Sequence, residues 1–110
     1  MKPGPTPPKT YEAFLKRYPK IAAAWELIGE SGQEGPLDAM TIRLVKLATA
    51  MGALREGAVR AGVRKALAEG ISAREIEQVI ALAAGAIGFP ATVAVFSWTR
   101  YMLPRTGKRR

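Results

Sequence analysis

The chain has 110 residues, which is enough for one domain with a modest core and too few for two independent cores. It carries 17 Lys and Arg against 9 Asp and Glu, and it contains no His and no Cys. The missing thiols and imidazoles exclude disulfides, iron–sulfur clusters, thiolate zinc sites and histidine general bases. We therefore expect no metal and no cofactor, and only carboxylate, amine, guanidinium and hydroxyl chemistry remains.

The two ends of the chain differ in composition from its middle. Four prolines among the first nine residues predict an extended leader over residues 1–9. Residues 104–110 contain four basic residues and no acidic one, so we expect a disordered basic tail there. One helical domain is expected over residues 10–103. No cationic, apolar signal segment opens the chain, which predicts a cytoplasmic location.

Apolar residues recur at helical spacing through the middle of the chain, and no window alternates convincingly with the period of a strand. Thr10 is predicted to cap a short helix that ends at Arg17, and Pro19 to begin a second helix that ends near Ser31. A loop is expected over residues 32–36. Asp38 is predicted to cap a third helix. Its apolar stripe is expected to consist of Met40, Leu44, Leu47, Met51 and Leu54.

Two further helices are indicated by their ends. A fourth helix is predicted from about Arg55 to Glu69, closed by Gly70. It places Val59, Val63, Ala66 and Leu67 on one face. Ser72 and Glu75 have the spacing of a capping box, the most specific local signal in the sequence, and predict the start of a fifth helix. With the segment that follows, the pattern predicts an all-α fold of about six helices.

The segment over residues 79–99 contains no charged residue. Its length suits a membrane span, but Gly85, Gly88 and Pro90 interrupt it, so two packed helices joined at Gly88–Pro90 are the favoured interpretation and no membrane is expected. Helices that are apolar on nearly every side cannot bury all their faces in so small a chain. The sequence therefore predicts a homo-oligomer whose interface includes residues 79–99.

Residues 35–103 carry a run of matches to one protein family. The run opens with Gly35-Pro36-Leu37-Asp38, continues from Thr41 to Ala48 and from Val63 to Ser72, and ends with Ala84 to Ala91. This stretch resembles the carboxymuconolactone decarboxylase family, which includes the alkylhydroperoxidase D proteins. The resemblance implies a helical bundle that assembles as a trimer or a hexamer.

The peroxidase branch of that family uses a glutamate, a Cys-x-x-Cys pair and a histidine. In an alignment through Arg64 and Gly70, these four positions fall on Arg43, Arg55, Ala58 and Gly62. Thiol peroxidase chemistry needs a thiolate nucleophile and a group that accepts its proton. Arginine, with a pKa above about 12, supplies neither. The resemblance therefore implies a member of the family without thiol peroxidase chemistry.

The residues that remain around this position suggest two kinds of site. If the packing of the family holds, Arg43, Arg55 and Arg60 lie around an apolar cavity between helices, and such a cluster suits a small anionic ligand. In the alternative interpretation, these arginines pair with Glu56 and other acids or face water. Glu56 is the candidate catalytic residue, a general base if burial raises its pKa, which would leave a residual lactone or keto-acid enzyme.

Three functions follow from these observations. The leading one is a homo-oligomer that binds a small anionic or apolar ligand or serves as an assembly scaffold. The second is a nucleic-acid-associated protein that uses its basic tail, with Arg60, Arg64 and Lys65 in support; the cations of the tail are Arg105, Lys108, Arg109 and Arg110. Because aromatic residues make up only 7% of the chain, we expect that binding to be electrostatic and unselective. The third is the residual enzyme that uses Glu56.

Overall fold

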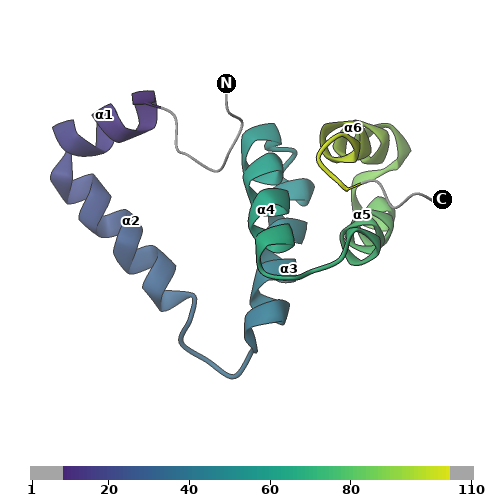
Figure 1. The fold of residues 1–110 in the computed structure, drawn as a ribbon, viewed down its shortest axis with the longest axis horizontal. Helices are drawn as coiled ribbons and strands as arrows, with labels where there is room; N and C mark the ends of the chain where they lie inside the picture. The colour runs from purple at the N-terminus through teal and green to yellow at the C-terminus, as the bar shows by residue number, and fades with distance from the viewer. Residues whose placement is uncertain (1–8, 105–110) are drawn as a thin grey trace. The chain divides into compact units, whose positions relative to one another are not determined.

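The structure is a computed structural model that describes residues 9–104. Six α-helices and no strand occur in these residues, which confirms the all-α class (Figure 1). The helices are α1 (Lys9–Arg17), α2 (Pro19–Ser31), α3 (Ala39–Gly52), α4 (Glu56–Ala68), α5 (Ala73–Ile87) and α6 (Phe89–Arg100). The predicted leader up to residue 8 and the tail from residue 105 lie outside the described residues.

The described helices group into two compact units. The first unit runs to Leu37 and the second begins at Asp38. In the first unit, α1 packs against α2, and the rings of Phe14 and Tyr18 lie with their centroids 5.2 Å apart. None of the residues of α1 or α2 is buried. The first unit therefore has helices without a core of its own.

The ends of the helices in the first unit agree in part with their predicted positions. Pro19 begins α2 as predicted, because its fixed φ suits the first turn of a helix. The hydroxyl of Ser31 donates to the carbonyl of Ile28 at 2.8 Å in the last turn. The prediction for α1 was wrong in one respect. Since α1 already begins at Lys9, Thr10 lies inside the helix and does not cap it.

The second unit consists of four helices around one core. Helix α3 contacts α4 and α5, and α6 contacts the same two helices. Arg43 pairs with Glu69, and Leu47 lies opposite Gly62, so α3 and α4 run antiparallel. The core is formed by apolar residues from all four helices and the α4–α5 turn: Leu47, Met51, Val59, Val63, Ala66, Ile71, Ile76, Val79, Ile80 and Val95.

The predicted apolar stripes are buried only where a neighbouring helix covers them. On α3, Leu47 and Met51 are buried, whereas Met40 and Leu54 at the two ends of the stripe are 41% and 45% exposed. The stripe was therefore predicted correctly in its middle and wrongly at its ends. On α4, the predicted core face of Val59, Val63 and Ala66 is buried and Leu67 is partly buried. The α3–α4 hairpin thus supplies five of the ten core residues.

Local hydrogen bonds fix the starts of α3 and α5. The carboxylate of Asp38 accepts a hydrogen bond from the Thr41 N–H at 2.8 Å, and bonds from Thr41 lower the pKa of Asp38. The Ser72 hydroxyl accepts from the Glu75 N–H at 3.0 Å, and the Glu75 carboxylate accepts from the Ser72 N–H at 2.8 Å. Both caps were predicted, and the capping box is confirmed in both of its bonds.

A single residue, Gly88, separates α5 from α6. Its φ of 87° lies in the left-handed region that favours glycine, which lets the chain end one helix and begin the next within one residue. The interpretation of residues 79–99 as two joined helices is therefore confirmed. Among the described residues, no helix is both long enough and apolar enough to cross a membrane.

Candidate functional site

The α3–α4 hairpin carries all four positions that the alignment assigned to the thiol site. Arg43 lies in the first half of α3, Arg55 is the N-cap residue of α4, and Ala58 and Gly62 lie within α4. At Gly62, where the aligned family residue is histidine, a Cβ atom would come 3.0 Å from Cδ1 of Leu47. The side chain of Leu47 thus occupies the space next to this position, and no side chain projects from it.

Arg43 forms the less exposed of the two ion pairs in the described residues. Its Nε and Nη2 atoms donate to Oε1 and Oε2 of Glu69, both at 3.0 Å, so the pair is bidentate. The Arg43 side chain is 17% exposed and that of Glu69 47%. Hydrogen bonds from Arg43 lower the pKa of Glu69, and the charges of Arg43, Lys46 and Lys65 lower that pKa further. Glu69 is the residue that follows α4, and the sequence analysis did not single it out.

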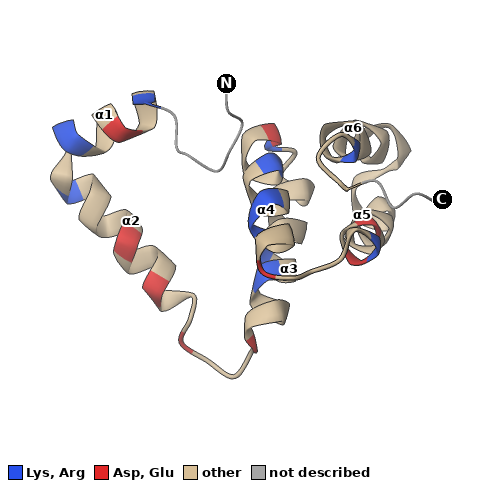
Figure 2. Ribbon diagram, in the orientation of Figure 1, with Lys and Arg blue, Asp and Glu red and all other residues tan. Residues whose placement is uncertain are grey.

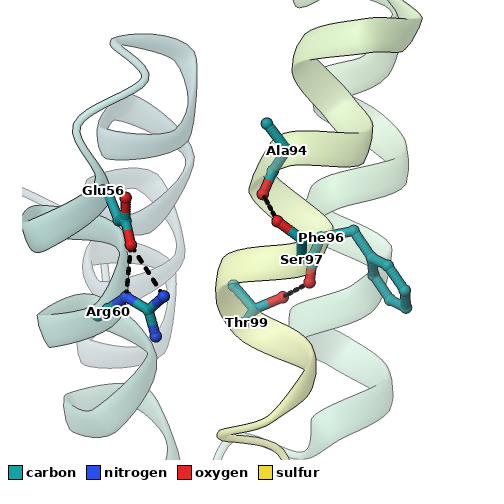
Figure 3. Close-up of polar contacts among 6 residues, drawn as sticks. All are labelled: Glu56, Arg60, Ala94, Phe96, Ser97 and Thr99. Atoms are coloured by element: carbon teal, nitrogen blue, oxygen red, sulfur yellow. Dashed lines mark hydrogen bonds and ion pairs between the residues drawn. The ribbon is translucent and has the colours of Figure 1, made fainter.

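Glu56 and Arg60 form the second ion pair, one turn apart on α4. The Nε and Nη2 atoms of Arg60 both donate to Oε2 of Glu56, at 3.0 and 2.8 Å. The pair lies on the side of α4 that is next to α6 (Figure 3). The nearby hydroxyls of Ser97 and Thr99 donate to carbonyls of α6 itself, those of Ala94 and Phe96. The α6 hydroxyls are therefore already paired within their own helix.

The structure brings together two of the predicted site residues and sets a third apart. Glu56 and Arg60 are in contact, and Arg55 precedes them at the exposed N-cap of α4. Arg43 instead pairs with Glu69. Glu69 follows Arg60 by nine residues, and nine residues of helix span about 13 Å at 1.5 Å per residue. Each of the two paired arginines has a carboxylate partner, which is the alternative that the sequence analysis left open.

Glu56 has the surroundings of a solvated surface carboxylate. Its side chain is 51% exposed and it accepts both hydrogen bonds from Arg60. The prediction of a general base at this position depended on burial, and the side chain is not buried. Within residues 9–104, no group of three or more acidic side chains is placed to hold a metal ion.

The end of α6 holds a cluster that the sequence analysis missed. The guanidinium carbon of Arg100 lies 5.8 Å from the ring centroid of Phe96 and 5.2 Å from that of Tyr101. Phe96 is 40% exposed and Tyr101 82%. The four-residue spacing between Phe96 and Arg100 was the available signal, because it places them on one face of a helix. Figure 2 shows that most of α6 carries no charge, so this end differs from the rest of the helix.

Comparison with known proteins gives one match. Searches of curated proteins and of solved structures found no significant similarity. The model of the carboxymuconolactone decarboxylase family matches residues 19–101. This match begins at the start of α2, earlier than the resemblance seen over residues 35–103, and it extends through α6. Because the matched region covers most of the six-helix fold, the chain belongs to the carboxymuconolactone decarboxylase family.

Proposed function

We propose that this protein is a self-assembling member of the carboxymuconolactone decarboxylase family that works without thiol peroxidase chemistry. The observation that carries the proposal is the exposed apolar surface of α5 and α6, here called the α5–α6 surface. Its large side chains are Leu82, Phe89 and Val93, which are 72%, 78% and 48% exposed. No charged residue occurs between Glu77 and Arg100. Apolar surface of this kind on a small protein is typical of a protein interface.

The first unit supports the same conclusion independently. On α2, the exposed residues Ile21, Trp25 and Ile28 follow one another at intervals of four and three residues, and they form one stripe. Helices as short as α1 and α2 are marginal in water unless tertiary packing supports them. Because the first unit by itself buries no residue of either helix, we infer that contacts outside this unit, of the kind an assembly supplies, cover this stripe as well.

The ion pairs favour an assembly function over binding of a small anion. The guanidinium groups of Arg43 and Arg60 are each held by a carboxylate of the same chain. Anion binding by Arg43, Arg55 and Arg60 stays a prediction, which calorimetric titration with phosphate and small carboxylates tests. Proton transfer by Glu56 also stays a prediction. Equal rates of the parent and Glu56→Gln on lactones and β-keto acids would remove it.

Sedimentation of the full chain at micromolar concentration tests the assembly. We expect the parent to sediment as a homo-oligomer, with a trimer or hexamer in agreement with the resemblance. Leu82→Glu places a charge on the α5–α6 surface and should shift the protein to smaller species, because an unpaired charge in an interface is costly. The matched control is Thr49→Glu, an exposed residue of α3, which should leave the assembly unchanged.

Two results would contradict the proposal. One is a parent chain that is folded and monomeric across the micromolar range. The other is an oligomer that persists unchanged in both Leu82→Glu and Val93→Glu, while circular dichroism shows that both variants remain helical. The second result would mean that the chain assembles through a surface other than α5–α6.

A further inference from the structure

We propose that the outer face of the α3–α4 hairpin binds the phosphate backbone of double-stranded DNA. This surface, here called the cationic face, consists of Lys46 on α3 and of Arg60, Arg64 and Lys65 on α4. None of these four side chains is buried. The cationic face shares no residue with the α5–α6 surface, so the inference does not depend on the proposed assembly.

The positive charge of the described residues is concentrated on the α3–α4 hairpin (Figure 2). Residues 39–68, which include both helices and the turn between them, contain six Lys and Arg and one acidic residue, Glu56. Asp38 and Glu69 flank the hairpin, and Glu69 is already held by Arg43. The segments on either side are balanced: residues 9–37 contain four basic and four acidic residues, and residues 71–104 contain two of each. The excess charge is therefore local to one hairpin.

Helical spacing and electrostatics place the four cations across the outside of the hairpin. Arg60 and Arg64 are four residues apart, which is one turn or about 6 Å along the axis of α4. Arg60 lies on the side of α4 that is next to α6 (Figure 3). The charges of Lys46 and Lys65 both lower the pKa of Glu69, so these two lysines lie near the same carboxylate, which pairs with α3. The cationic face thus extends from the α6 side of α4 to its α3 side.

Three of the four cations form no ion pair within residues 9–104, namely Lys46, Arg64 and Lys65. Arg60 is held by Glu56, but the two side chains are 39% and 51% exposed. An exposed pair of this kind contributes little to stability, so a phosphate that binds Arg60 has little to displace. A polyanion contacts several cations at once and gains from each because every contact releases counterions.

The surroundings of the cations favour a DNA duplex over other polyanionic partners. Neither α3 nor α4 contains an aromatic residue, so a single strand finds no ring on which to stack its bases. The neighbours of the cations on α4 are small and none is buried: Gly57, Ala61 and Ala68. They offer no large apolar side chain that inserts into a lipid surface, but they let a ligand approach the helix closely. The major groove of B-form DNA is about 12 Å wide and admits a helix, whereas that of duplex RNA is too narrow.

Fluorescence anisotropy of a labelled DNA duplex of about 20 base pairs tests the proposal with the full chain. We expect binding in about 50 mM salt, with affinity that falls steeply toward about 200 mM. The double variant Arg64→Gln and Lys65→Gln should bind at least about tenfold more weakly. It should also reduce the slope of log affinity against log salt by about 2, since each phosphate contact contributes about 0.9. Glutamine is a good helix former, so α4 should remain helical in this variant.

Matched variants separate the position of a charge from the net charge of the chain. Arg74→Gln with Lys20→Gln also removes one arginine and one lysine, both exposed, and should weaken binding by less than about threefold. Glu56→Gln releases Arg60 for a phosphate contact and should strengthen binding by about twofold to fivefold. Glu77→Gln makes the same change in net charge on α5 and should alter binding by less than about twofold. The tail has the same sequence in every variant, so its cations add a common background.

Four outcomes would overturn the proposal. The first is no binding of the duplex at low salt. The second is an equal loss of affinity in the Arg64–Lys65 double variant and in its Arg74–Lys20 control, which would mean that net charge alone holds the DNA. The third is a single strand or an RNA duplex of the same length that binds as tightly as the DNA duplex. The fourth is a double variant that sediments as a smaller species than the parent without DNA, which would place the cationic face in a subunit interface.

Discussion

The two units of this protein both consist of short helices, but the second unit buries apolar residues and the first does not. In the second unit, α3 to α6 bury ten apolar residues that are each no more than 8% exposed. In the first unit, the apolar residues of α2 remain on the surface, with Trp25 61% and Ile28 60% exposed. Both patterns have helical periodicity, so the period alone does not tell whether a stripe is covered within its own unit.

The difference teaches what each unit needs in order to be stable. Four helices around one core supply their own burial, whereas a pair of short helices does not. The family model matches α2 as well as α3 to α6, so part of the first unit, which lacks a core, belongs to the matched region. We therefore expect α2 to pack against a surface outside its own unit. Substitutions in the two units should then have different effects on the free energy of unfolding.

Removing volume from the core should have the largest effect. Met51 is fully buried, and Met51→Ala should cost about 2–5 kcal/mol of the free energy of unfolding, because it removes apolar contacts and leaves a cavity. Ile28→Ala on α2 should change the same quantity by less than about 0.5 kcal/mol at concentrations where the chain is a monomer. Urea denaturation followed by circular dichroism measures both. An equal cost for the two variants in the monomer would abolish the contrast between the units.

Refilling the position of the family histidine should have the next largest effect. Gly62→His introduces a Cβ atom 3.0 Å from Leu47 Cδ1 and a ring beyond it, and overpacking of this kind costs about 1–3 kcal/mol. Leu47→Ala makes room for the ring, so the double variant should be more stable than the sum of the two single changes implies. Strict additivity in denaturant unfolding would show that Leu47 is not what limits the space at residue 62.

Removing a helix cap in the second unit should reduce the free energy of unfolding by less than either of the changes above. Ser72→Ala eliminates the hydroxyl that accepts from the Glu75 N–H and should cost about 1 kcal/mol. The control is Ser97→Ala on α6, where the hydroxyl donates to the Ala94 carbonyl inside a helix. Since alanine is the better residue in a helix interior, this change should be close to neutral. Thermal unfolding of the two variants distinguishes a cap from a surface hydroxyl.

The helix boundaries were largely predictable because their signals lie within a few residues of one another. Pro19, the Ser72–Glu75 capping box and Gly88 each mark a helix end by their own backbone chemistry. The burial of a stripe was less predictable, because it depends on which helix packs beside it. Met40 and Leu44 belong to the same predicted stripe, yet only Leu44 packs against the core.

Of the two ion pairs at the candidate site, one was predictable from the sequence and the other was not. The Glu56–Arg60 pair joins residues four apart, and such a pair follows from helical spacing alone. The Arg43–Glu69 pair joins residues 26 apart, and it exists only because α3 and α4 run antiparallel. No local rule indicates that register. The cluster of Phe96, Arg100 and Tyr101 at the end of α6 could not be recognised without knowing that its rings are exposed, since an aromatic residue at helical spacing is ordinarily a core residue.

Acid should lower the free energy of unfolding by a small amount, and we expect this loss to arise in the second unit. The pKa of Glu69 is lowered in the folded chain by Arg43, so this carboxylate adds stability above its unfolded pKa and loses it as the pH falls through the folded pKa. Between about pH 5 and pH 3 the parent should lose more stability than Glu69→Gln, which carries no titrating group there. Because Glu69 is 47% exposed, the difference at neutral pH should stay below about 1 kcal/mol.

The same titration localises the effect within the molecule. Both ion pairs found in residues 9–104 belong to the second unit, so a chain reduced to residues 38–110 should keep the acid sensitivity of the parent. Added salt should narrow the difference between the parent and Glu69→Gln, because it screens an exposed pair. If the reduced chain loses its acid sensitivity while remaining helical, the sensitive carboxylates lie in the first unit, and ion pairing there would have to replace the core that it lacks.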